Sequence, residues 1–155
     1  MKFPSRHRTA PAPPGLVATA RVDRRTRALL PRLARGNIAV VHHQDMDRAT
    51  AQALLDRGVS AVVNTAPFIT GRYPNLGPEL LADAGVQLVE VDPGALSTIR
   101  DGHRVRLHDG GIHEGEHLVA QGREVDAADV RERMDLAREG LAAQLTSFTH
   151  NSTEF

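Results

Sequence analysis

The chain has 155 residues, of which 41% are hydrophobic and 3% aromatic, so a single domain must build its core from aliphatic side chains. It contains no cysteine, which excludes disulfides, thiolate metal sites and cysteine nucleophiles. The net charge is zero, but residues 1–36 carry nine Lys or Arg and one acid, whereas the remainder carries ten basic and eighteen acidic residues.

The uneven distribution of charge indicates what the basic N-terminal segment, residues 1–36, could bind. We expect the basic third to pack against the acidic remainder, with docking on nucleic acid or an anionic lipid as the alternatives. No aromatic residue lies among the arginines of residues 21–35, so a nucleic-acid partner is not expected. No apolar run approaches the roughly 20 residues of a membrane helix, and no export signal is recognised, so a cytoplasmic location is expected.

The chain begins with a segment rich in proline and basic residues, residues 1–15, which predicts a disordered arm. A strand is predicted over residues 16–22. Asp23 is then expected to cap a helix that ends at Gly36. Pro31 must kink or split that helix, because proline lacks an N–H and clashes with the preceding turn.

A βαβ unit follows. Residues 38–41 form a short apolar run typical of a strand buried on both faces, and Asp45 is expected to cap the helix that leads to a second strand over 59–63. A crossover of this length predicts that the two strands are parallel neighbours and that the connection between them is right-handed. Pro78 suits the first turn of a further helix, and a third strand is predicted over 86–91.

From residue 101 onward, Asp-Gly and related pairs interrupt short apolar stretches, a pattern typical of antiparallel hairpins. The last element is a long helix with Asp126 as its cap and Asp129 at the capping-box position. A heptad-like apolar stripe predicts that this helix forms an interface. The stripe consists of Val130, Met134, Ala137, Leu141, Leu145 and Phe148.

The expected fold class is α/β: a small parallel β-sheet with flanking helices, antiparallel hairpins and a long C-terminal amphipathic helix. The α/β domain is assigned to residues 16–125. Residues 126–155 are expected to form a linking and oligomerisation helix that leads to an absent C-terminal domain.

The loop over residues 69–78 is the most site-like segment, because it joins the carboxyl end of a strand to the start of a helix. Free helix N–H groups beside an arginine suit a phosphate or carboxylate. The candidate ligand residues are Thr70, Gly71, Arg72, Asn75 and Gly77. The alternatives are ordinary turn chemistry and, for Arg72 with Tyr73, an interface anchor.

Histidines offer two further candidates. His42 and His43 follow the carboxyl end of a strand, a common place for catalytic residues, but no Gly-x-Ser-x-Gly elbow accompanies them. A second group in the hairpin region would suit zinc or copper if strands brought two or three together, although scattered histidines are ordinary there and no metal is expected. That group is His103, His108, His113 and His117. Phosphate-loop fingerprints are missing, and no catalytic set or cofactor is assigned to this chain.

Four stretches carry a resemblance to a known family. They are TAPAPPG (9–15), LLPRL (29–33), NTAPFITGRYPNLGP (64–78) and GLAAQLTSFTHNSTEF (140–155). Together they resemble the N-terminal region of the SteA-type cytokinetic-ring proteins of actinobacteria, and the resemblance spans essentially the whole chain.

The resemblance implies a role in cell division at the septum, with a membrane-bound partner. The later portion of such proteins resembles thiamine pyrophosphokinase, and ATP and Mg would be needed only if that portion were present and active. The expected function is therefore a non-catalytic scaffold that forms a homodimer and binds a partner. The alternatives are a phosphate-binding or phosphotransfer-related domain, or an N-terminal fragment of a thiamine pyrophosphokinase-like enzyme.

A second resemblance concerns the order of elements from residue 36 to 107, which is similar to the swivelling phosphohistidine domain of phosphoenolpyruvate-using enzymes. The phosphorylated histidine of those domains corresponds to Leu76 here. Because leucine cannot accept a phosphoryl group, this resemblance implies a shared scaffold without the chemistry.

Overall fold

The computed structural model describes residues 13–72 and 74–153, with side chains as far as Ser147. In this part of the chain, eight strands form one mixed sheet in the order β7-β6-β5-β1-β2-β3-β4-β8. Strands β1 to β4 are parallel and the others join antiparallel. The α/β class is thus confirmed, and most of the expected arm (residues 1–15) lies outside the described residues.

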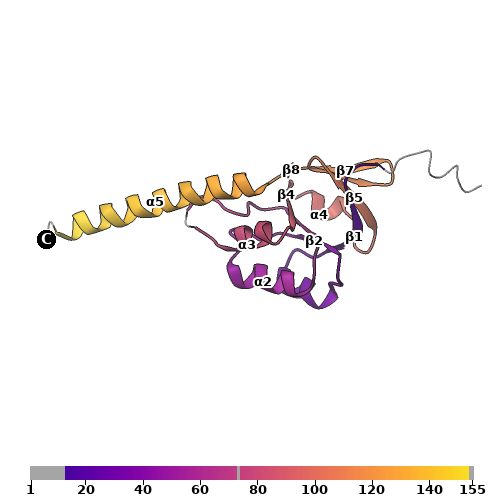
Figure 1. Cartoon of the computed structure of the whole chain (residues 1–155), viewed down its shortest axis with the longest axis horizontal. Helices are drawn as coiled ribbons and strands as arrows, with labels where there is room; N and C mark the ends of the chain where they lie inside the picture. Colours follow the sequence, from indigo (N-terminus) through magenta and orange to yellow (C-terminus); the bar gives the residue numbers. More distant parts are fainter. Residues whose placement is uncertain (1–12, 73, 154–155) are drawn as a thin grey trace, which may run out of the picture.

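The parallel half follows the predicted alternation of strands and helices (Figure 1). Proline 31 lies in the 3₁₀ turn, so it splits the first helix as predicted. The elements are β1 (Leu16–Val22), α1 (Thr26–Leu29), the 3₁₀ turn η2 (Leu30–Arg32), β2 (Ile38–Val41), α2 (Arg48–Asp56), β3 (Ala61–Asn64), α3 (Gly77–Asp83) and β4 (Gln87–Glu90).

Two predicted helix caps are wrong. The cap of α2 is Asp47, whose carboxylate accepts a hydrogen bond of 2.9 Å from Thr50 N–H. Asp45 instead has a left-handed backbone (φ 52°), and its carboxylate accepts hydrogen bonds from the N–H and hydroxyl of Thr70. Asp23 accepts from Arg25 N–H, two residues on, in a local turn before α1. Aspartate also favours such local turns, so its position before a helix did not establish that it caps the helix; α1 begins after Arg25, which makes no side-chain cap bond.

The antiparallel half confirms the predicted hairpins. It also contains a four-residue helix, α4, that was not predicted because one turn shows no periodicity. The elements are α4 (Ala95–Thr98), β5 (Arg104–His108), β6 (Gly111–Glu114), β7 (His117–Gln121) and β8 (Arg123–Glu124).

A single residue, Gly122, joins the two outermost strands of the sheet, because β7 ends at Gln121 and β8 begins at Arg123. The β8 strand pairs with β4 and β7 pairs with β6, so the sheet curls round until its two ends meet. Gly122 N–H also donates to the carbonyl of Gly110 at 2.7 Å. A Cβ at this position would collide with the carbonyl oxygen of Glu90, so the closure requires glycine.

The curled sheet separates two hydrophobic cores. One face of β2, β3 and β4 packs against α1, α2, α3 and the start of α5, with Phe68, Leu54 and Leu81 fully buried. The other face packs inside the curl against β5, β6 and α4, with Ile38, Val63 and Ile112 buried. Successive strand residues alternate between the two cores, which explains why these strands read as unbroken apolar runs.

The last element, α5 (Ala127–Thr153), has 27 residues and projects far beyond the rest of the molecule (Figure 1). Its first turn carries the predicted capping box: Asp129 N–H donates to the Asp126 carboxylate at 2.8 Å, and Asp126 N–H donates to the Asp129 carboxylate at 3.1 Å. At 1.5 Å per residue the helix is roughly 40 Å long. None of the helices in the described part of the chain combines the length and hydropathy needed to cross a bilayer.

Candidate functional site

Polar residues gather where the parallel strands end. Asn64, at the end of β3, is fully buried and all its polar atoms are used. Its side-chain oxygen accepts from the N–H groups of His43 and Ala66, and its amide donates to the carbonyl of His43 at 2.8 Å. Asn64 therefore fixes the segment after β2 relative to β3, and it is a structural residue.

The two histidines after β2 point to different neighbours. The Nδ1 atom of His42 lies 2.8 Å from the Thr65 hydroxyl, and that of His43 lies 2.8 Å from the Thr26 hydroxyl. Burial lowers the pKa of His43, while the charge of Asp47 opposes that shift. Hydrogen bonds from Thr50 hold the pKa of Asp47 below its usual range, so this carboxylate is ionised at neutral pH.

His43 lines a cleft of about 330 Å³ between α1 and α2. Because Thr26 occupies Nδ1, Nε2 is the nitrogen left for another partner. The Thr26 hydroxyl is buried, however, and no hydrogen bond joins His43 to Asp47 among the described contacts. The cleft thus holds a neutral imidazole beside a hydroxyl. A nucleophile and base also need an acid that orients the base, and Asp47 does not bind His43 in this way.

The five predicted ligand residues of the 69–78 loop line neither the cleft at His43 nor the larger cleft described below. Thr70 is engaged by Asp45, and Arg72 is exposed with its N–H directed at the Thr70 hydroxyl at 3.4 Å. Gly77 lies so close to the backbone carbonyls of Met46 and Asp47 that a Cβ would collide with them. The loop therefore packs α3 onto the start of α2.

The remaining loop residues, Gly71 and Asn75, are partly buried. Gly71 has φ 92°, and its carbonyl is the nearest atom to a Cβ built on Gly140 of α5, at 3.6 Å. The side-chain nitrogen of Asn75 is buried and has no hydrogen-bond partner among the described residues. Tyr73, the other proposed interface anchor, lies outside the described residues.

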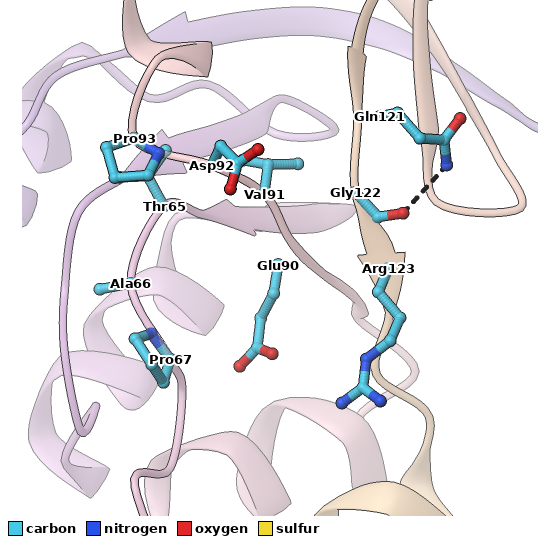
Figure 2. Close-up of a pocket in the computed structure, with 10 residues that line it drawn as sticks. All are labelled: Thr65, Ala66, Pro67, Glu90, Val91, Asp92, Pro93, Gln121, Gly122 and Arg123. Atoms are coloured by element: carbon cyan, nitrogen blue, oxygen red, sulfur yellow. Dashed lines mark hydrogen bonds between the residues drawn. The ribbon is translucent and has the colours of Figure 1, made fainter.

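A larger cleft, of about 370 Å³, opens at the carboxyl ends of β3 and β4 (Figure 2). Its walls come from residues 65–67, residues 90–93 and the link between β7 and β8, with Glu90 lying between the other two segments. Sequence reasoning missed this cleft. Its one visible signal was Glu90, an acid at the carboxyl end of β4, and the far wall comes from residues that only the curl of the sheet brings near.

Glu90 is held in place by an arginine from α5. The Arg133 guanidinium donates two hydrogen bonds to the carboxylate, at 2.6 and 2.9 Å, and Phe68 N–H donates a third at 2.8 Å. Both charged side chains are more than four-fifths buried. The hydrogen bonds to Glu90 raise the pKa of Arg133, so the guanidinium stays charged at neutral pH, and its bonds to Glu90 tie α5 to the sheet.

The predicted α5 interface divides in two. Val130, Met134 and Ala137 are buried in the core of this chain, so in this arrangement they do not face a partner, contrary to the prediction. Leu141 is half-buried, Leu145 is 59% exposed, and the side chain of Phe148 lies outside the described set. The boundary between domain and projecting helix thus falls near Gly140.

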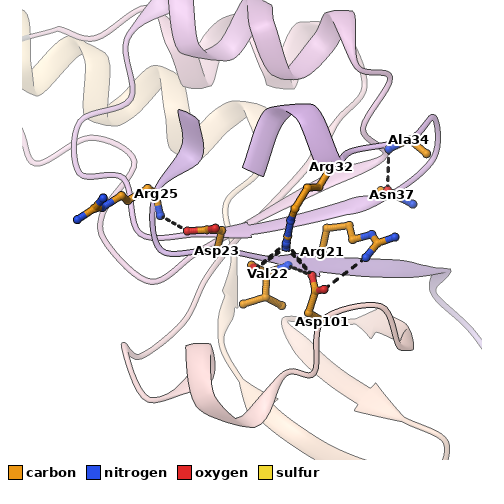
Figure 3. A network of polar contacts seen from close by, with 8 residues as sticks. All are labelled: Arg21, Val22, Asp23, Arg25, Arg32, Ala34, Asn37 and Asp101. Carbon is orange, nitrogen blue, oxygen red and sulfur yellow. Dashed lines mark hydrogen bonds and ion pairs between the residues drawn. The ribbon is translucent and has the colours of Figure 1, made fainter. Parts of the chain in front are cut away.

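The basic segment was expected to pack against acids, and part of it does. Asp101 accepts hydrogen bonds from Arg21, Arg32 and Val22 N–H (Figure 3). Burial alone would raise the pKa of Asp101, but the bond from Val22 and the charges of Arg32 and Arg21 hold it below its usual value. Other basic residues of the segment are exposed and form no ion pair among the described residues. These are Arg24, Arg25, Arg27 and Arg35.

The hairpin histidines are dispersed. His103 lies 3.0 Å from the Glu114 carboxylate and His108 lies 3.1 Å from Asp109, while His117 is exposed on β7. Within the described residues, no three His, Asp or Glu side chains lie close enough together to hold a metal ion.

No protein-family model matches this chain, and no curated protein matches its sequence.

Proposed function

We propose that this chain is a non-catalytic interaction module of the cell-division machinery, which associates with a second copy of itself through the distal half of α5, residues 141–153. The observation that carries the proposal is a helix that continues well past its contact with the domain. Residues 142–147 are all exposed, and a large aliphatic side chain, Leu145, is among them.

The composition of this half fits contact with protein. Residues 127–139 contain seven charged residues, whereas residues 140–153 contain no Asp, Glu, Lys or Arg. A helix surrounded by water usually carries charge on its exposed face. Most of the stability of a helix in a protein comes from packing of its apolar face, so a partner that covers residues 141–153 would stabilise them.

A second copy is the simplest partner, because the apolar stripe continues through Leu141, Leu145 and Phe148 at coiled-coil spacing. Two helices paired over these few turns bury less surface than a standard stable interface. We therefore expect a reversible dimer with a dissociation constant of about 1–100 μM.

Sedimentation velocity across this concentration range tests the self-association. The full chain should sediment increasingly as a dimer, and Leu141→Glu or Leu145→Glu should shift it to monomer. Leu118→Glu is the matched control, because Leu118 on β7 is similarly exposed, at 53%, but lies on another element. A chain that stays monomeric at the highest concentration would exclude the dimer.

The cellular role comes from the family resemblance and needs its own test. A fluorescent fusion of the chain, expressed in an actinobacterium, should be enriched at the division septum, and Leu145→Glu should reduce that enrichment if self-association contributes to it. An even distribution along the cell for the unsubstituted chain would contradict the cell-division role.

A further inference from the structure

The cleft at the ends of β3 and β4 has the volume and the position of a small-molecule site, which self-association through α5 does not use. Its volume of about 370 Å³ lies within the range of sites for small metabolites. It opens at the carboxyl edge of parallel strands, where ligands of α/β proteins commonly bind.

One wall is already neutralised. Glu90 gives both carboxylate oxygens to Arg133 and receives a further hydrogen bond from Phe68 N–H. Its charge is thus balanced by α5 and not by a group within the cleft, and it contributes shape more than charge to a ligand.

The β8 side of the cleft carries an exposed cation. In the pairing of β4 with β8, Arg123 stands directly opposite Glu90. Arg123 is exposed and has no acidic partner among the described residues, since Arg133 already occupies Glu90. A guanidinium beside a cleft suits a phosphate or carboxylate, to which it can donate two parallel hydrogen bonds.

The remaining walls combine one acid with apolar surface. Asp92 is exposed and forms no ion pair among the described residues, and it lies across the cleft from the 121–123 segment (Figure 2). A carboxylate in this position would repel a bare anion but accept hydrogen bonds from hydroxyl groups. Pro67 and Pro93 offer apolar faces for a carbon skeleton.

We infer that this cleft binds a small sugar that carries one anionic group. The Arg123 guanidinium pairs with the phosphate or carboxylate, and the Asp92 carboxylate accepts hydrogen bonds from the hydroxyls. The cleft is open, so the affinity is modest, with a dissociation constant of about 0.1–1 mM. This binding is independent of the self-association of α5.

Isothermal titration calorimetry on the full chain tests the inference with glucose 6-phosphate, ribose 5-phosphate, glucuronate, glucose and inorganic phosphate. At least one of the three anionic sugars should bind, and the comparison of phosphate esters with glucuronate identifies the anionic group. Glucose and inorganic phosphate alone should bind at least tenfold more weakly. In ¹H–¹⁵N spectra, the amide signals of Ala66 and Gly122 should shift with the bound sugar.

Three substitutions locate the site. Arg123→Gln should weaken binding about tenfold or more, because a charge-assisted hydrogen bond is lost. Asp92→Asn should weaken it about threefold, whereas tighter binding would show that Asp92 only repels the ligand. Arg131→Gln removes the same charge from an exposed position on α5 and should have no effect.

The inference is overturned if none of the three anionic sugars binds below about 10 mM, or if Arg123→Gln binds as well as the unsubstituted chain. Thermal unfolding of each variant checks that the β4–β8 pairing is intact. Because the titration does not depend on dimer formation, failure here leaves the proposed self-association unaffected, and the reverse also holds.

Discussion

The two halves of α5 belong to one continuous helix, but they are in different surroundings. The first half buries Val130, Met134 and Ala137 in the core and is tied to β4 by Arg133, whereas residues 142–147 of the second half are exposed. One apolar stripe runs through both. Periodicity therefore identifies the face of a helix that is covered, but it does not say whether the same chain or another molecule covers it.

The charge pattern separates the halves better than the stripe does. The first half is charged on the side away from the core, as a helix with one wet face should be. The second half lacks charge on every side. This difference gives experiments in which the two halves should respond differently.

The largest effect is expected from placing a charge in each half. Met134 is fully buried, so Met134→Asp should destabilise the fold by about 4 kcal/mol or more, through lost packing and a buried charge. Leu145→Asp should change the free energy of unfolding by less than about 0.5 kcal/mol, measured by urea unfolding at a concentration where the chain is monomeric. Equal destabilisation by both substitutions would mean that the distal half also packs on its own domain.

The second-largest loss of stability is expected from breaking the Glu90–Arg133 ion pair, which ties the first half of α5 to the sheet. Glu90→Gln leaves Arg133 mostly buried without its carboxylate, and we expect a loss of about 2 kcal/mol. Arg133→Met in the same chain should restore part of that loss, because the unpaired charge is gone.

Asp135→Asn is the control for the ion pair. It breaks the exposed pair with Arg138 on the same helix and should cost less than about 0.5 kcal/mol. If Glu90→Gln were as mild as Asp135→Asn, the Glu90–Arg133 pair would not hold α5 in place.

Gly140 marks the point where the two halves meet. A Cβ built there has only an ordinary contact of 3.6 Å with the Gly71 carbonyl, so Gly140→Ala should stabilise the helix by about 0.5–1 kcal/mol. Gly77→Ala should destabilise the fold, because its Cβ would collide with the backbone before α2. Thermal unfolding distinguishes them, and a destabilising Gly140→Ala would indicate that the helix must bend at this position.

The smallest expected effect is a change in the free energy of unfolding with pH, which depends on His43 in the domain and not on α5. Burial lowers the pKa of His43, so its imidazole binds a proton more readily in the unfolded chain than in the folded chain. The contribution of His43 to stability is therefore present above its unfolded pKa of about 6.5 and is lost as pH falls below that value. Urea unfolding at pH 7.5 and 5.5 should show a smaller drop for His43→Gln than for the unsubstituted chain. His117→Gln, at an exposed site, should retain the full drop.

The sequence predicted the elements well where local chemistry decides them. The apolar runs of β2 and β3, the split at Pro31 and the capping box at Asp126 are all confirmed, because each depends on neighbours within a few residues. The caps at Asp23 and Asp45 were wrong because local turns compete for the same carboxylates.

The candidate site was much less predictable. The 69–78 loop has the composition of a ligand loop, but Thr70 and Gly77 are used in packing. The larger cleft combines Glu90 with Arg123, and only the closure of the sheet brings these residues opposite each other. A pairing that depends on the path of the whole chain leaves no pattern in a short window of sequence.

That closure also has a consequence for how the protein is made. Strand β1 is synthesised before the other strands of the sheet, and its antiparallel neighbour β5 and the closing strand β8 follow only after most of the domain has been synthesised. Until then, the inner core of β1 to β4 is uncovered, and contacts between such distant segments form slowly. The nascent sheet should therefore be prone to aggregate until β5 and β8 are released, and α5 should dock after the sheet has closed.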